Sequence, residues 1–300
     1  MLIAVVLGAL WRNLIPVPAI LEPGIAMAAK RVLRWGVVLL GLQLSLPAIL
    51  ALGPGVLLIC VCAVAVTFFA TLALGKVLGV DPELRLLIAS GFSICGAAAV
   101  AGVQGAVKAP QEKVAAAVAL VVLFGTLMIP AMPLLIGALG LSDGDAGTLI
   151  GGATHEVAQV VAAAGIAGGG AILAVAVPVK LARVVLMAPV VAGVSLVMRR
   201  KNGAPVAGQK RPPILPLFVV GFVAMVLVAT IGLVPAPVLD ATKVLQQLLL
   251  ATAMFALGLG VNVKSLIKLG IRPVVLGLLS TLVIIAVVLI GIALGAGARV

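Results

Sequence analysis

Long apolar segments recur from one end of the chain to the other, and they constrain the fold more than any other feature. An α-helix needs about 20 apolar residues to cross a bilayer. Ten segments of this kind cover residues 2–16, 25–43, 54–75, 83–106, 112–137, 147–166, 171–198, 214–233, 240–262 and 272–296. Barrel strands would alternate apolar with polar residues, whereas these runs are continuous. The sequence therefore predicts an all-α, multi-pass membrane protein with about ten transmembrane helices.

The composition excludes a soluble globular protein. Hydrophobic residues make up 64% of the chain and charged residues 9%, whereas soluble domains carry about 25% charged residues. Cys60, Cys62 and Cys95 all lie inside apolar runs. Their spacing indicates neither a disulfide framework nor a metal site. We therefore expect a single transmembrane domain over residues 1–300, with no cofactor and no metal.

The net charge of +12 follows the distribution of Lys and Arg in short loops, which the positive-inside rule explains without a nucleic-acid partner. We take the basic loop 199–213 as cytoplasmic. Fourteen basic residues then lie on or near that side, namely Arg12, Lys30, Arg31, Arg34, Lys76, Arg85, Arg199, Arg200, Lys201, Lys210, Arg211, Lys264, Lys268 and Arg272. Lys108, Lys113 and Arg299 fall on the other side. This bias predicts both ends of the chain outside the cytoplasm.

An internal repeat links two distant segments. LGLQLSL at 40–46 resembles LGLGVNV at 257–263, 217 residues later, and the two segments are predicted to run in opposite directions. Inverted repeats are typical of secondary transporters; chance similarity between Leu/Gly-rich helix ends is the alternative. A second likeness joins residues 93–102 and 154–165. It relates segments predicted to run in the same direction, so we interpret it as shared local chemistry.

Two segments are predicted to be discontinuous helices. They read SGFSICGAAAVAG at 90–102 and GGATHEVAQVVAAAG at 151–165, and small and hydroxyl residues weaken a helix at mid-span. A second half-helix starting near Gly96 or His155 would present free N–H groups inside the membrane, which favours an anion. Close helix packing through Gly and Ala is the alternative.

Ionisable residues gather near these breaks. His155, Glu156 and Gln159 lie in the second discontinuous segment. Lys180 and Arg183 lie in the apolar segment that follows it, 171–198. Counted from residue 171, the two cations sit roughly 14 and 18 Å deep. Charges at that depth are costly and face a cavity or each other. We expect Glu156 to pair with one cation, which leaves a net positive charge; an ion pair that only locks two helices together is the alternative.

The chain resembles a bacterial family of proposed sulfate exporters, a group of conserved hypothetical integral membrane proteins. The resemblance is carried by KRVLRWGVVLLGLQLSL (30–46), SICGAAAVAG (93–102), EKVAAAVALVVLFGTL (112–127), HEVAQVVAAAG (155–165), VKLARVVLMAPV (179–190) and LGLGVNVKSL (257–266). It implies kinship with the cation/proton antiporter and bile-acid symporter superfamily, with inverted repeats and crossing discontinuous helices. It also implies a bacterial inner-membrane location and a further apolar helix ahead of segment 2–16.

The resemblance also implies the site. The polar motif positions of the family fall on Ser93, Cys95, Gly96, His155, Glu156, Gln159, Lys180 and Arg183. The family commonly has Asp where this chain has Glu156, which lengthens the reach of the carboxylate. It commonly has Thr where Ala182 stands, which removes a hydroxyl.

These observations predict a secondary transporter of a small anion, either sulfate or an organic sulfonate or carboxylate, coupled to a proton or sodium. The substrate would be held by Ser93, Cys95, Gly96, His155, Gln159, Lys180 and Arg183. His155 and Glu156 would carry the coupling ion. A cation/proton antiporter that uses Glu156 is the alternative.

Other classes fit less well. An intramembrane enzyme is not expected, because the chain has one His and neither a zinc-ligand cluster nor a nucleophile–base pair at usable spacing. A scaffold or sensor would bind none of these ions. Membrane lipid is an expected partner, and the sequence leaves the oligomeric state open, with a homodimer among the arrangements.

Overall fold

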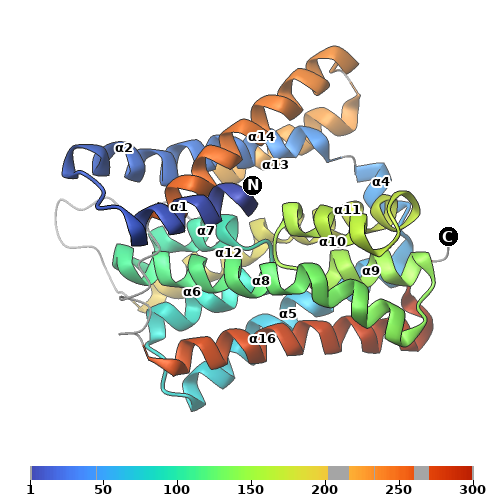
Figure 1. Cartoon of the computed structure of the whole chain (residues 1–300). Helices are drawn as coiled ribbons and strands as arrows, with labels where there is room; N and C mark the ends of the chain where they lie inside the picture. Colours follow the sequence, from blue (N-terminus) through green and yellow to red (C-terminus); the bar gives the residue numbers. More distant parts are fainter. Residues whose placement is uncertain (1, 45, 202–215, 233, 260–269, 299–300) are drawn as a thin grey trace.

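A computed structural model describes residues 2–44, 46–201, 216–232, 234–259 and 270–298, and within these ranges the regular elements are all helical (Figure 1). Among the described residues, five helical stretches are long and apolar enough to cross a membrane. They are α5 (Gly53–Val77), α8 (Gln111–Leu139), the pair α11 (Gly170–Val185) and α12 (Met187–Lys201), α14 (Ala236–Leu259) and α16 (Ile271–Gly291). The predicted all-α membrane class is confirmed.

One group of helices, here called the peripheral bundle, lies at the top of the view in Figure 1. It consists of α1 (Leu2–Leu14), α2 (Glu22–Met27), α3 (Leu33–Leu40), α13 (Leu217–Ile231) and α14. α1 packs along α14, and both α13 and α14 pack against α3. Gly41, directly after α3, allows this close approach, because a Cβ there would lie 2.5 Å from the Phe222 carbonyl oxygen.

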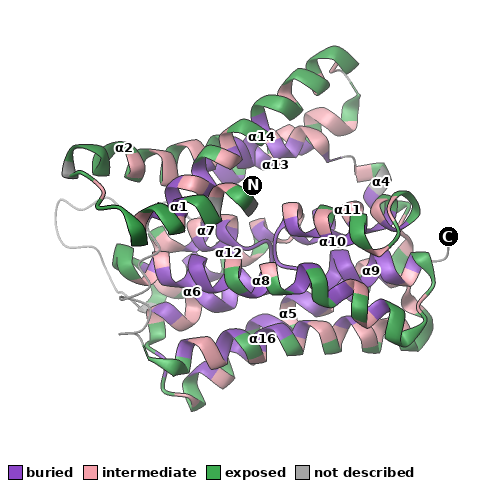
Figure 2. Ribbon diagram, in the orientation of Figure 1, coloured by how far each residue is buried: buried purple, intermediate pink, exposed green. Residues whose placement is uncertain are grey.

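The remaining long helices form the central bundle, to which the short α4 (Leu46–Leu50) leads. It contains α5, α6 (Pro82–Ser93), α7 (Ala97–Val107), α8, α9 (Asp143–Ala153), α10 (Val157–Ala167), α11, α12 and α16. Figure 2 shows buried residues concentrated here, whereas α2 and the outer end of α14 are mostly exposed. Contacts between the two bundles are sparse and include α3 with α7 and α12 with α13.

α6 and α7 form a hairpin that enters and leaves the bundle at the same end. Asp81 caps α6 by accepting hydrogen bonds from the N–H groups of Glu83 and Leu84. Lys113, in the first turn of α8, lies 2.8 Å from the same carboxylate. A continuous helix over 82–107 would be about 39 Å long and would separate Asp81 from Lys113 by the thickness of the membrane. α7 therefore returns to the surface from which α6 started.

α9 and α10 form a second hairpin at the opposite end. Gly147 faces Val175, and Gly151 faces Val179, so α9 and α11 run side by side in the same direction. α10 is followed by Gly168 and Gly169, both with positive φ, and α11 begins at the next residue. α10 therefore returns to the surface from which α9 started. We call the two turns tip 1 (residues 94–96) and tip 2 (residues 154–156).

The predicted breaks are confirmed, because one falls between Ser93 and Ala97 and the other between Ala153 and Val157. The prediction that both segments cross the membrane is wrong, and with it the expected crossing of discontinuous helices. Helices of 11 or 12 residues extend about 17 Å and reach only the middle of a bilayer. Hydropathy indicates that a segment lies in an apolar environment. It does not distinguish a helix that spans the bilayer from a hairpin that returns to the surface where it began.

The hairpins also change which basic residues share a surface. The prediction put Lys108 and Lys113 outside, but Lys113 bonds Asp81 at the start of α6. Lys108, the residue directly after α7, lies at that same surface. Lys76 near the end of α5 and Arg85 in the first turn of α6 lie there too. With Lys108 and Lys113 moved, this surface carries still more of the basic residues, and its assignment to the cytoplasm stays a prediction.

The second sequence likeness also changes its meaning. Residues 93–102 and 154–165 belong to hairpins that enter from opposite surfaces, so α7 and α10 run in opposite directions away from their tips. The interpretation as segments of one orientation is wrong, because it assumed that both cross. The copy at 257–263 continues past Leu259 and lies partly outside the described residues, as does loop 199–213 beyond Lys201. The long repeat and the single domain over 1–300 stay predictions.

Candidate functional site

The two tips meet in the interior of the central bundle. The Ala97 N–H, at the start of α7, donates to Oε1 of Glu156 in tip 2 (3.1 Å). Gly96 has φ +77°, and a Cβ there would lie 2.6 Å from Cγ of Glu156. Glycine is required at this position because of both its backbone conformation and this close approach.

Lys180 of α11 joins the tips from the side. Its side chain is fully buried, and Nζ donates to the carbonyl oxygens of Ile94 (2.9 Å) and Thr154 (2.7 Å). One ammonium group therefore bridges tip 1 and tip 2.

Arg183, one turn further along α11, makes a second bridge. Nη1 donates to the carbonyl oxygen of Thr154 (3.0 Å), and Nη2 donates to that of Ser93 (2.8 Å). These carbonyls end the first helix of each hairpin, where the helix dipole is negative. The structure places the two cations on the carbonyl ends of α6 and α9, because an ammonium or guanidinium group can only donate.

Glu156 does not pair with either cation. Within the described ranges, the ion pairs shorter than 4.0 Å are those of Lys113 with Asp81 and Glu83, so the predicted pairing of Glu156 with Lys180 or Arg183 is wrong. The carboxylate instead accepts from the first N–H of α7, where the helix dipole favours a negative charge. The carboxylate therefore lies at the N-terminal end of α7, whereas the two cations lie at the C-terminal ends of α6 and α9.

Gln159 shapes tip 2. Its Oε1 accepts a hydrogen bond from the backbone N–H of Glu156 (3.0 Å), which satisfies one of the N–H groups at the start of α10. The amide lies against Gly125 of α8, where a Cβ would overlap it. The side chain of Gln159 thus sets the direction in which α10 leaves the tip.

His155 points toward α16. Its Nε2 lies 3.1 Å from Oγ1 of Thr281, and the Thr281 hydroxyl donates to the carbonyl oxygen of Gly277 (2.9 Å). Since that hydroxyl proton is used, we assign Nε2 of His155 as the donor to Oγ1 of Thr281. Its ring lies 4.6 Å from that of Phe92, and Nδ1 has no hydrogen-bond partner among the described residues.

Ser93 and Cys95 contribute less than their positions in the motif indicate. The Ser93 hydroxyl donates to the Ala89 carbonyl within α6 (2.7 Å), so that only its carbonyl serves Arg183. Sγ of Cys95 lies 4.0 Å from Sδ of Met187. The structure therefore brings together Gly96, His155, Glu156, Gln159, Lys180 and Arg183, while the side chains of Ser93 and Cys95 turn away from this polar group.

Three participants were missed by the sequence analysis. Thr281 is one hydroxyl in a long apolar run, which is a weak signal. The Thr154 carbonyl accepts from both cations, and a backbone carbonyl leaves no trace in a residue pattern. Gly125 accommodates Gln159 but is one of 35 glycines.

Comparison with known proteins places the chain in a family. The profile of "Conserved hypothetical protein 698" matches residues 1–277. UPF0324 membrane protein Cgl0015/cg0018 of Corynebacterium glutamicum is 49% identical over 97% of this chain and 84% of its own length. UPF0324 membrane protein TauZ of Paracoccus denitrificans is 34% identical over 97% of this chain and 87% of its own length.

A Bacillus cereus UPF0324 membrane protein is 37% identical over 94% of this chain and 80% of its own length. No solved structure matches the chain. The relatives are bacterial membrane proteins by name, and the apolar helices agree with that location. The chain is therefore a multi-pass bacterial membrane protein that belongs to the family of conserved hypothetical protein 698, the UPF0324 membrane proteins.

Proposed function

We propose that this protein is a secondary transporter of a small anion, which binds where the two hairpin tips meet. The observation that carries the proposal is the charge balance of the buried cluster. Lys180 and Arg183 are fully buried and Glu156 is 7% exposed, so two cations stand against one carboxylate. No other acidic residue lies in either tip or in the two helices that follow tip 2.

An excess positive charge inside a membrane protein needs a counterion. An unpaired charge at this depth costs about 2.5–3.5 kcal/mol or more, and the carbonyl oxygens around the cations lower this cost without removing the net charge. A mobile anion in the tip region would balance it. Sulfate, an organic sulfonate and a carboxylate all have the required charge.

The amide groups for such an anion lie at the start of α10, directly after tip 2. Val157 and Ala158 occupy the first two positions of α10, where N–H groups have no acceptor within the helix. Both residues are partly exposed, unlike the cations behind them. The N–H groups would bind the anion directly, while Lys180 and Arg183 would hold the tips together and supply the positive field.

The arrangement of the two bundles provides for transport. The tips belong to the central bundle, which contacts the peripheral bundle sparsely. Movement of one bundle against the other is the usual means by which secondary transporters expose a central site alternately. We propose a coupled proton or sodium ion, with His155 and Glu156 as its carriers, and no enzymatic activity.

The proposal is tested by flux into liposomes that contain the whole chain. Labelled sulfate and a labelled short alkanesulfonate are the probes, driven in turn by proton and sodium gradients. Arg183→Lys keeps the charge and is expected to retain measurable flux, whereas Arg183→Gln should abolish it. Size-exclusion profiles and thermal unfolding show whether each variant is folded, and full flux in a folded Arg183→Gln variant would contradict the proposal.

One observation favours a second candidate, the cation/proton antiporter. Glu156 is a buried carboxylate with no cationic partner within 4.0 Å among the described residues, and such a group can bind Na⁺ or a proton. Glu156→Gln separates the two candidates. An anion site gains affinity when a nearby negative charge is removed, whereas an antiporter loses cation binding altogether.

A further inference from the structure

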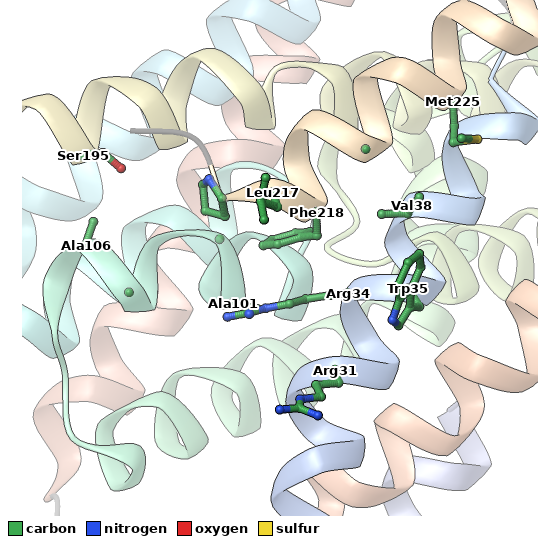
Figure 3. Close-up of a pocket in the computed structure, with 14 residues that line it drawn as sticks. Arg31, Arg34, Trp35, Val38, Ala101, Ala106, Ser195, Leu217, Phe218 and Met225 are labelled. Carbon is green, nitrogen blue, oxygen red and sulfur yellow. The ribbon is translucent and has the colours of Figure 1, made fainter. Parts of the chain in front are cut away.

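A cavity of about 690 Å³ opens between the two bundles, away from the tips. It lies among α3, α7, α12 and α13, and Figure 3 shows its lining residues. The lining includes Arg31, Arg34 of α3, Gly105 of α7 and Ser195 of α12. Because α7 ends beside Lys108 at the surface predicted to be cytoplasmic, the cavity lies in the half of the molecule on that side.

Arg34 extends into this cavity without an acidic partner. Figure 3 shows its guanidinium group reaching from α3 toward Ala101 of α7, and its Cζ lies 5.5 Å from the centre of the Phe218 ring. Its Nε is buried and has no hydrogen-bond partner among the described residues. No carboxylate lies within 4.0 Å of Arg31 or Arg34 in those residues. The remaining segments of the chain contain no Asp or Glu, so no acidic side chain of the protein neutralises these arginines at that distance.

The rest of the cavity is apolar. Its walls include Val38, Ala101, Phe218 and Met225. Inorganic sulfate would satisfy the arginines but would leave these walls without contacts and lose its own hydration. An anionic head group attached to an apolar body matches both parts of the cavity.

One wall of the cavity belongs to α7, the helix that begins directly after tip 1. Ala101 and Gly105 lie four and eight residues beyond Ala97, whose N–H binds Glu156, and these spacings correspond to about 6 and 12 Å along α7. We propose that this cavity is the cytoplasmic binding site of the transported anion and that its ligand is an organic sulfonate or carboxylate with an apolar body. The inference rests on the proposed function and specifies its substrate class.

A second cavity of about 720 Å³ provides a matched control. It lies among α5, α6 and α12 of the central bundle and also carries two basic residues, Lys76 and Arg85. It has a similar volume and charge, but it does not lie between the bundles.

Both cavities contain a glycine that a larger side chain can replace. Nothing lies within 4 Å of a Cβ built at Gly105 in the first cavity or at Gly193 in the second. Gly105→Leu therefore fills the proposed site, and Gly193→Leu fills the control cavity, neither with a clash at Cβ.

The experiment measures binding to the whole chain in nanodiscs of neutral lipid. Straight-chain alkanesulfonates of two to six carbons and sulfate are titrated by calorimetry. We expect affinity to rise about fourfold for each added methylene until the cavity is full, with sulfate the weakest ligand. Arg34→Gln should weaken binding at least about tenfold, and Arg34→Lys less. Gly105→Leu should abolish binding, whereas Gly193→Leu and Lys76→Gln should not change it.

Several results would overturn the inference. These are equal affinity for sulfate and all alkanesulfonates, equal loss in Gly105→Leu and Gly193→Leu, or absence of alkanesulfonate binding. An Arg34-dependent stabilisation seen only with phosphatidylglycerol in the nanodisc would assign the cavity to a lipid head group instead. Sulfate flux without alkanesulfonate binding would leave the proposed function standing and remove this inference. Binding without flux of any anion would remove the proposed function and leave a cavity that binds alkanesulfonates without transporting them.

Discussion

The two hairpins form one site from opposite surfaces, but they contribute different chemistry. Tip 1 and the helix ends on either side of it supply backbone atoms, namely the carbonyls of Ser93 and Ile94 and the N–H of Ala97. Tip 2 supplies side chains, those of His155 and Glu156, in addition to the Thr154 carbonyl. Tip 1 should therefore be sensitive to changes in backbone conformation, and tip 2 to changes in side-chain chemistry.

The largest effect is expected in tip 1 from Gly96→Ala. The positive φ and the contact with Cγ of Glu156 together should destabilise the fold by about 2–4 kcal/mol. Thermal unfolding in detergent measures this loss. Gly105→Ala in α7, the helix that follows tip 1, is the control, since nothing lies within 4 Å of its Cβ. Equal stability of the two variants would contradict the requirement for glycine at tip 1.

The next effect concerns the cations that join the tips. Lys180→Met leaves the Ile94 carbonyl without its donor in a buried site and removes one of two donors from Thr154, which should cost about 1–3 kcal/mol. Since Arg183 also donates to Thr154, the effects of Lys180→Met and Arg183→Met should not add, and a double-mutant cycle should give a coupling of at least about 0.5 kcal/mol. Strict additivity would show that the two bridges are independent.

The contrast between the tips explains what the sequence could predict. Both breaks were predictable because Gly96 and the run at 151–156 weaken a helix locally. The buried charges were predictable because Lys180 and Arg183 interrupt an apolar run. The sequence could not predict that each hairpin returns to its own surface, because the evidence is two contacts between distant residues. These are the contact of Asp81 with Lys113 and that of Gly151 with α11. The partners of the cations were also not predictable, because every residue carries a carbonyl.

A smaller effect is expected at the edge of tip 2, where His155 bonds Thr281 of α16. Thr281→Val removes the acceptor of Nε2 at 3.1 Å and should cost about 1 kcal/mol, with altered dependence of flux on pH if His155 carries the coupling proton. Thr252→Val is the control, because Thr252 is exposed and its hydroxyl bonds the Leu248 carbonyl of its own helix. If stability and the pH dependence of flux were unchanged in both variants, the hydrogen bond between His155 and Thr281 would contribute neither to the fold nor to proton coupling.

The smallest effect is expected far from both tips, where hairpin 1 begins. Partial burial acts to raise the pKa of Asp81, but hydrogen bonds from the Lys113 ammonium and from the N–H groups of Leu84 and Glu83 outweigh it, so the net pKa is lowered. A lowered pKa means that the carboxylate stabilises the fold above its unfolded value, near pH 4, and that this stability is lost as the pH falls through the folded value. Because the Asp81 side chain is 45% exposed, the contribution should stay below about 1 kcal/mol.

Unfolding measured between pH 7 and pH 3 should show a slightly smaller loss of stability on acidification in Lys113→Gln than in the unmodified protein. Lys108→Gln, at the other end of the turn between α7 and α8, should follow the unmodified protein. If Lys113→Gln lowered the stability at pH 7 as much as Gly96→Ala does, the contacts at the start of α6 would stabilise the α6–α7 hairpin as strongly as those of tip 1.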